Sequence, residues 1–222
     1  MIMAHGFSGT QQRSLARTAQ GFADAGFAVF TFDYRSFGES EGTPRQVIDI
    51  AHQLKNWKAA VAFTLGLDGI DRDRIGLWGS SLSGAHVVHV AAHNPAIAAV
   101  IAQVPFNGFP SRVEGRSAAE SIGLFWVAIN DRARALLGHR PLYVPVVGRP
   151  GERAIITTER ADTIVLALKG SHWENRVAPR VILDMFFWRS ARFGGASPQN
   201  AAPCLPRRAG CAYAARAGPR DR

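Results

Sequence analysis

Apolar residues at the start of the chain form short continuous runs with a helical pattern between them. Short apolar runs at residues 1–5 and 27–34, each followed by Gly and Ser, predict buried parallel strands. Between them, residues 11–25 predict a helix, because Leu15, Ala19, Phe22 and Ala23 fall on one helical face that ends at Gly26. Together these segments predict a β-α-β unit.

The same alternation of strand and helix continues to residue 106. Residues 45–65 predict an amphipathic helix, 74–79 a strand, 82–93 a helix stopped by Asn94-Pro95, and 97–106 another strand. Strands that alternate with helices predict an α/β fold with a mostly parallel sheet and helices on both faces.

The alternation is lost between residues 107 and 170. This region contains one predicted helix at 116–137, a stretch punctuated by Pro and Gly, and the apolar run "ADTIVLAL". A further helix, interrupted near Pro179, is predicted at 173–189. At 222 residues the chain is long enough for one α/β domain and too short for two large ones.

The net charge of +9 is concentrated in the last part of the chain. Residues 1–188 carry 19 Lys and Arg against 16 Asp and Glu, whereas residues 189–222 carry 7 Arg against one Asp. In this tail 24 of 34 residues are Ala, Gly, Pro or Arg. The remaining residues supply too few large apolar side chains to form a core. We expect residues 191–222 to be either a disordered extension or the product of GC-rich DNA translated in a shifted reading frame. We favour the shifted frame.

Several partners and cofactors are not expected. The body has no stripe of Lys and Arg with interleaved aromatic residues, so we expect no nucleic-acid binding. No apolar run is long enough for a membrane span and no signal peptide is evident, so a cytoplasmic protein without membrane attachment is expected. Cys204 and Cys211 fit neither a disulfide framework nor a zinc site, and there is no Gly-rich phosphate loop, which predicts no metal or organic cofactor.

Three serines in "RIGLWGSSLSGAHVV", residues 74–88, are candidates for a nucleophile. A reactive serine needs a sharp strand-to-helix turn with small residues two positions before and after it. Gly79 ends the predicted strand, so this register places Ser81 at the turn, with Ser83 in the position where Gly is usual. Ser80 would have Trp78 where a small residue is required, and Ser83 would lie inside the helix.

The turn "HGFSG" after the first strand predicts the second half of such a site. A hydrolase with a serine at this turn needs two backbone N–H groups that stabilise the oxyanion. The predicted pair is Phe7 and Leu82, and we expect His5 to be structural.

The sequence resembles the α/β-hydrolases, in particular the branch of esterases, dienelactone hydrolases and serine aminopeptidases. The resemblance rests on "AHGFSGT", "AGFAVFTFDYRSFGESEG" and "DRIGLWGSSLSGAHVVHVAAHNPAIAAVIAQVPF", in this order. It implies a hydrolase core at 1–106, a cap or insert at 107–190 and a structural role for Asp33. A small-molecule acyl substrate is implied, in a pocket partly lined by Phe106, Phe109, Phe125 and Trp126.

The resemblance further implies attack of Ser81 on an ester, thioester or amide carbonyl, with a histidine base and an acid that follow in the order Ser, acid, His. In the family these follow two later strands, and that part of this chain is the tail. Asp162 and His172 are the first candidates for acid and base, because they follow Ser81 in the right order. Asp131, Asp184 and His139 are less favoured candidates. The predicted helix after Ser81 carries three further histidines, His86, His89 and His93. Typical members also have two more strands before residue 1.

Two functions are therefore open: a serine hydrolase with an acyl-enzyme at Ser81, or a catalytically defective hydrolase fragment without acid and base. A haloalkane or epoxide hydrolase is disfavoured, because these enzymes need an aspartate at the turn. The sequence leaves the oligomeric state open.

Overall fold

The computed structural model describes residues 1–109, 116–188, 201–202 and 212–216 of the chain. Four neighbouring parallel strands form most of its larger sheet: β1 (Ile2–Ala4), β2 (Phe30–Phe32), β3 (Ile75–Ser80) and β4 (Ile97–Gln103). The strand order is β2-β1-β3-β4-β8-β7, in which β8 (Ala212–Arg216) pairs antiparallel with β4, and β7 (Ala201–Ala202) pairs with β8.

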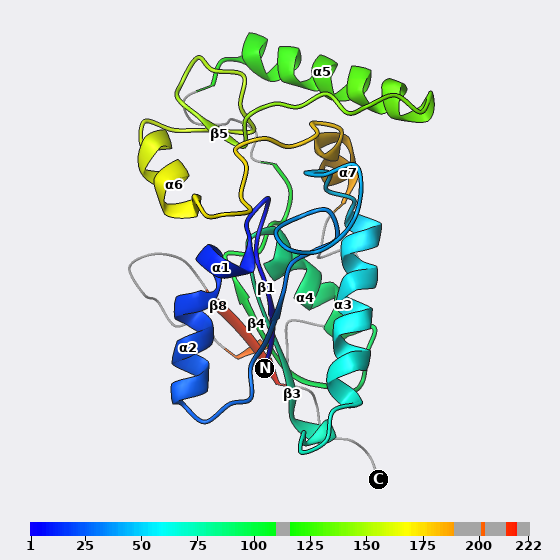
Figure 1. Ribbon diagram of the computed structural model, residues 1–222, viewed down its shortest axis with the longest axis vertical. Helices are drawn as coiled ribbons and strands as arrows, with labels where there is room; N and C mark the ends of the chain where they lie inside the picture. The colour runs from blue at the N-terminus through cyan, green and yellow to red at the C-terminus, as the bar shows by residue number, and fades with distance from the viewer. Residues whose placement is uncertain (110–115, 189–200, 203–211, 217–222) are drawn as a thin grey trace.

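Helices cover both faces of this sheet, as the sequence predicts. Figure 1 shows α2 (Ala16–Asp24) on one side of the strands, and α3 (Ile50–Leu65) and α4 (Leu82–Ala92) on the other. The side chains alternate accordingly: Met3 and Trp78 pack with Leu15 in a small core on the α2 side, while Ile2 and Leu77 belong to the larger core. The prediction of a mostly parallel sheet with helices on both faces is confirmed.

The remaining elements lie mainly beyond the carboxyl ends of the strands (Figure 1). They are α5 (Ala118–Leu136), the short parallel pair β5 (Val147–Gly148) and β6 (Ile156–Thr157), α6 (Ala161–Leu168) and α7 (Val181–Phe187). A capping box starts α5, since Ser117 and Glu120 each bind the other's backbone N–H. The division into a core, a cap and a tail at residues 106 and 190 remains a prediction.

Three predicted elements have different limits in the structure. The helix expected at 11–25 is divided at Leu15 into α1 (Gln11–Ser14) and α2. The helix expected from residue 45 begins at Ile50, because the Asp49 side chain accepts the N–H of His52 and caps that end. The helix expected at 173–189 forms only after Pro179, as α7, since proline cannot supply an N–H within a helix.

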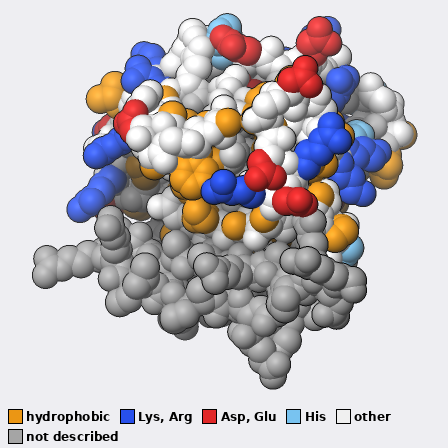
Figure 2. All heavy atoms as spheres, turned by 90° about the horizontal axis from the view of Figure 1, so that it is seen from below, with side chains coloured by type: hydrophobic (Ala, Val, Ile, Leu, Met, Phe, Trp, Pro, Cys, Tyr) orange, Lys and Arg blue, Asp and Glu red, His pale blue; other side chains and the backbone are white. Residues whose placement is uncertain are grey.

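Strand β2 is half-buried, although a buried strand is predicted there, because it lies at the edge of the sheet. Of the tail, only β7 and β8 are described, so its proposed disorder or frame shift stays a prediction; Cys204 and Cys211 lie outside the described residues. On the face in Figure 2, basic and acidic side chains of the described residues are interspersed.

Candidate active site

Ser81 lies at a sharp turn between β3 and α4. Its backbone has φ 55° and ψ −120°, in a region that residues other than glycine rarely adopt and that costs about 1–3 kcal/mol. Two hydrogen bonds hold this conformation, from Ser81 N to the Gln103 carbonyl and from Phe106 N to the Ser81 carbonyl, each 2.9 Å long. Ser81 is exposed, whereas Ser80 belongs to β3 and Ser83 is fully buried in α4.

Glycines allow β3 and α4 to approach closely around this turn. A Cβ added to Gly79 would lie 2.4 Å from the Ser83 carbonyl oxygen, and one added to Gly84 would lie 3.1 Å from Pro105 Cα. The backbone therefore excludes a side chain at Gly79, two residues before Ser81. Two residues after Ser81, the small side chain of Ser83 is accommodated.

The turn after β1 packs directly against Ser81. Strands β1 and β3 are neighbours with Ala4 opposite Gly79, so the loops at their carboxyl ends meet. A Cβ added to Gly6 would lie 2.9 Å from the Ser80 carbonyl oxygen and 3.3 Å from Ser81 Cβ. Only a glycine permits this contact.

Two donors fix the peptide that joins Gly6 to Phe7. The Gly6 carbonyl accepts hydrogen bonds from His5 Nδ1 at 2.9 Å and from Gly9 N at 3.3 Å. Because the Phe7 N–H belongs to the same peptide plane, these bonds also fix its direction. Leu82 is the first residue of α4, where an N–H has no acceptor within the helix.

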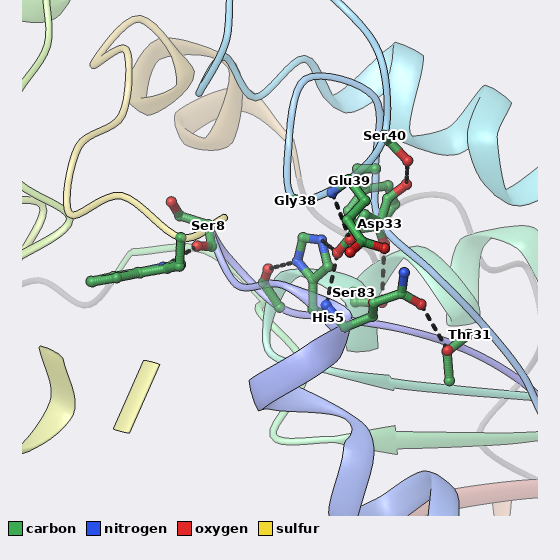
Figure 3. A network of polar contacts seen from close by, with 12 residues as sticks. His5, Ser8, Thr31, Asp33, Gly38, Glu39, Ser40 and Ser83 are labelled. Carbon is green, nitrogen blue, oxygen red and sulfur yellow. Dashed lines mark hydrogen bonds and ion pairs between the residues drawn. The ribbon is translucent and has the colours of Figure 1, made fainter. Parts of the chain in front are cut away.

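Asp33 connects this turn with the loop after β2 (Figure 3). Its carboxylate accepts Gln11 N at 2.7 Å and Glu39 N at 3.2 Å, and one oxygen lies 3.5 Å from His5 Nε2. Burial lowers the pKa of His5, and the hydrogen bond to Gly6 and the charge of Asp33 oppose this shift. These contacts of Asp33 and His5 join the loops after β1 and β2 to each other. The structural roles expected for the two residues stay a prediction.

The candidate acid and base have other partners in the structure. Asp162 is 77% exposed on α6 and pairs with Arg149. His172 is about half exposed, with Nε2 3.6 Å from Glu39 Oε1. Among the described residues, no hydrogen bond or ion pair joins Asp162, His172 and Ser81 to one another.

The other candidate acids and histidines also make contacts away from Ser81. Buried Asp131 accepts Leu142 N at 2.8 Å and Arg180 Nε at 2.9 Å, and Asp184 pairs with Arg132. His139 is exposed, and the ring of His89 on α4 lies 4.4 Å from that of His93, which directly follows this helix. Buried His86 instead faces Tyr34, with its Nδ1 3.3 Å from the phenol oxygen.

Three hydrogen bonds near Ser81 have no signal in any local sequence pattern. Tyr34 bonds to Ser83 and Trp57, and the indole N–H of Trp173 donates to the Ser8 carbonyl at 2.8 Å. Each joins residues far apart in the sequence, so no local pattern indicates it; the only signal is that Tyr34 directly follows Asp33 in the motif after β2.

The predicted apolar pocket stays a prediction. Phe106 packs against Phe109, whereas Phe125 and Trp126 are 38% and 64% exposed on α5. A cavity of about 470 Å³ lies elsewhere, between α5 and residues 151–154. Among the described residues there is no cluster of three metal-binding side chains, and none of their helices is long and apolar enough to span a membrane.

Comparison with known proteins agrees with this geometry. The family model of the alpha/beta hydrolase fold matches residues 1–142, a stretch that includes the turn after β1 and Ser81. The chain belongs to the α/β-hydrolase family. Its core strands and helices are thus those of a family of hydrolases.

Named relatives of this α/β-hydrolase include the quorum-quenching protein AidA of Acinetobacter baumannii, 40% identical over 195 residues that cover 86% of the chain and 64% of the relative. The thiohydrolase aneE of Aspergillus aculeatus is 38% identical over 47% of the chain and 33% of its own length. Among solved structures, the α/β hydrolase GrgF of a Penicillium species superposes with a TM-score of 0.67 at 26% identity, over 86% of this chain and 65% of that one. The chain thus spans between one third and two thirds of these proteins.

Proposed function

We propose that this chain carries the acyl-transfer site of a serine hydrolase, with Ser81 as the nucleophile. The observation that carries the proposal is the conformation of Ser81, an exposed serine held at φ 55° between a strand and a helix and in contact with the Gly6 turn. A backbone held in this way would present the serine hydroxyl at the turn with little rearrangement before reaction.

The Phe7 and Leu82 N–H groups are proposed as the oxyanion donors. Attack of Ser81 Oγ on an ester, thioester or amide carbonyl would pass the hydroxyl proton to a base and turn the carbonyl oxygen into an oxyanion, which two fixed N–H groups would stabilise. Collapse of this intermediate would break the bond to the leaving group, which takes up that proton, and leave an acyl-enzyme for water or another acceptor. The names of two relatives, a thiohydrolase and the acyltransferase drtE of Aspergillus calidoustus, support an acyl group as the transferred unit.

A second candidate, a chain with the nucleophile and donors but without a working base, is favoured by the contacts of His172. Its Nε2 faces Glu39, and Asp162 binds Arg149, so neither contact prepares a proton acceptor for Ser81. His172 is nevertheless the base candidate to test first, with Asp162 as its acid.

The nucleophile is tested by labelling with an alkyl p-nitrophenyl phosphonate, followed by mass spectrometry of the peptide that contains residues 75–92. Because His172 faces Glu39 and Asp162 binds Arg149, we expect slow labelling. Over a long incubation the label should reach this peptide in the wild type and in the control Ser80→Ala, but not in Ser81→Ala. Undiminished labelling of Ser81→Ala would contradict the assignment.

A further inference from the structure

A buried cluster of four polar side chains lies directly behind the Ser81 turn, and the proposed mechanism does not use it. Its members are Tyr34 after β2, Trp57 on α3, and Ser83 and His86 on α4, each at most 1% exposed. We call these four residues the elbow clamp.

The Tyr34 hydroxyl is the centre of the elbow clamp. It lies 2.7 Å from Trp57 Nε1, which donates to it, 3.1 Å from Ser83 Oγ and 3.3 Å from His86 Nδ1. Its single proton satisfies either Ser83 or His86, and its second lone pair then accepts from the other. Both arrangements leave the hydroxyl fully bonded, as burial requires.

Ser83 is the residue that departs from the Gly-x-Ser-x-Gly pattern, and its hydroxyl explains the departure. A Cβ added to Gly79 would lie 2.8 Å from Ser83 Oγ, so the hydroxyl sits against the end of β3. A glycine at position 83 would leave the Tyr34 hydroxyl with one partner fewer inside the core. Serine at this position therefore ties the first turn of α4 to the loop after β2 and to α3.

Tyr34 also contacts the other half of the proposed site. Its ring lies edge-on to the ring of His5, with centroids 4.9 Å apart, and His5 Nδ1 donates to the Gly6 carbonyl. The phenol thus touches the segment that orients the Phe7 N–H as well as the turn that contains Leu82. Small displacements of such donors reduce rates strongly, because their stabilisation depends on being already in place.

We propose that Tyr34 and Ser83 are positioning residues that hold Ser81 and the Leu82 N–H in register through the elbow clamp. The inference rests on the proposed role of Ser81. Neither residue touches the substrate; both act through the backbone of residues 81–83.

The test compares Tyr34→Phe, Ser83→Ala and the double variant with the wild type. Tyr34→Phe keeps the ring contacts and removes only the hydroxyl. Thr64→Val is the matched control, because it removes another buried hydroxyl, which bonds to Ala60 on α3 at 2.8 Å, away from Ser81. Trp57→Phe is a further variant if Ser83→Ala does not fold.

The rate of phosphonate labelling of Ser81 is measured in folded protein, together with amide hydrogen exchange of residues 79–85. We expect each single variant to label about tenfold more slowly, because each removes buried hydrogen bonding at the Tyr34 hydroxyl. The double variant should be no slower than the slower single one. Exchange at residues 79–85 should rise in these variants and stay unchanged in Thr64→Val.

Wild-type labelling rates in Tyr34→Phe and Ser83→Ala, with unchanged exchange, would overturn the elbow clamp as a positioning device. Strictly additive effects in the double variant would also overturn it. Failure of the proposed function is distinguishable, because the wild type itself would then carry no label at Ser81; the exchange measurement still decides the clamp in that case.

Discussion

At the scale of single residues, His86 makes stability depend on pH. Burial, and then the charges of His89 and His5, lower the pKa of His86 to about 3, so the folded state keeps the ring neutral. Unfolded histidine binds a proton below about pH 6.5, and the unfolded state is favoured by that proton. The contribution of neutral His86 to the free energy of unfolding is therefore fully present above pH 6.5, and it is lost as the pH falls from 6.5 towards 3.

We expect the free energy of unfolding of the wild type to fall between pH 6.5 and 4 more steeply than that of His86→Asn. The difference in slope should be about 1.4 kcal/mol per pH unit, the amount for one proton. Urea unfolding at a series of pH values measures it. Since carboxylates and His5 titrate in both proteins, parallel slopes would show that His86 is not the source.

At the scale of elements, the loop between α6 and α7 supports the turn after β1. Trp173, almost buried in this loop, donates its indole N–H to the Ser8 carbonyl, and Ser171 Oγ donates to Gln12 Oε1 at 3.1 Å. Ser8 has φ 51° and directly follows Phe7, so the loop helps to hold a turn that is strained on its own.

We expect Trp173→Phe to cost about 1 kcal/mol of stability and to slow labelling of Ser81 severalfold, because the Ser8 carbonyl loses its donor while the apolar contact stays. Trp126→Phe, a change at a largely exposed indole on α5, is the control and should change neither quantity. Thermal unfolding and the labelling rate measure the two effects. Equal labelling rates in both variants would remove Trp173 from the support of the site.

The elements and the site differ in how much the sequence reveals. The core strands and the Ser81 turn follow from short local patterns, since Gly79, Ser81 and Gly84 lie within six residues. The early start expected at residue 45 was wrong, because Gln46 has φ 58°, outside the right-handed helical region, and Asp49 caps the helix that begins at Ile50. The elbow clamp could not be predicted, because Tyr34 and Ser83 are 49 residues apart and meet only through packing.

At the scale of the whole molecule, we expect this chain to hydrolyse p-nitrophenyl acetate only weakly. It carries a proposed nucleophile and two proposed donors, while His172 faces Glu39. Loss of the catalytic histidine of a comparable triad lowers turnover on the order of a million-fold, and donors and binding alone retain roughly 10³ to 10⁴ over water.

Turnover per mole of folded protein is measured for the chain, for His172→Ala and for the control His139→Ala. All three should agree within about twofold, at the residual level that donors and binding provide. A loss of more than tenfold in His172→Ala alone would identify His172 as a working base. The turnover of the AidA relative, assayed in the same way, provides the comparison with a longer protein of the family.

The pairing of β1 with β3 should also determine at which stage of folding Ser81 reaches its proposed reactive geometry. The two loops of the site come from residues 5–9 and 80–84, and they meet only once Ala4 lies opposite Gly79. Contacts between distant segments of a chain form late, because loop closure must precede them, whereas a helix such as α3 forms from local contacts. We therefore expect the proposed reactivity of Ser81 to return during refolding only after the parallel sheet has closed, and later than the recovery of helical circular dichroism.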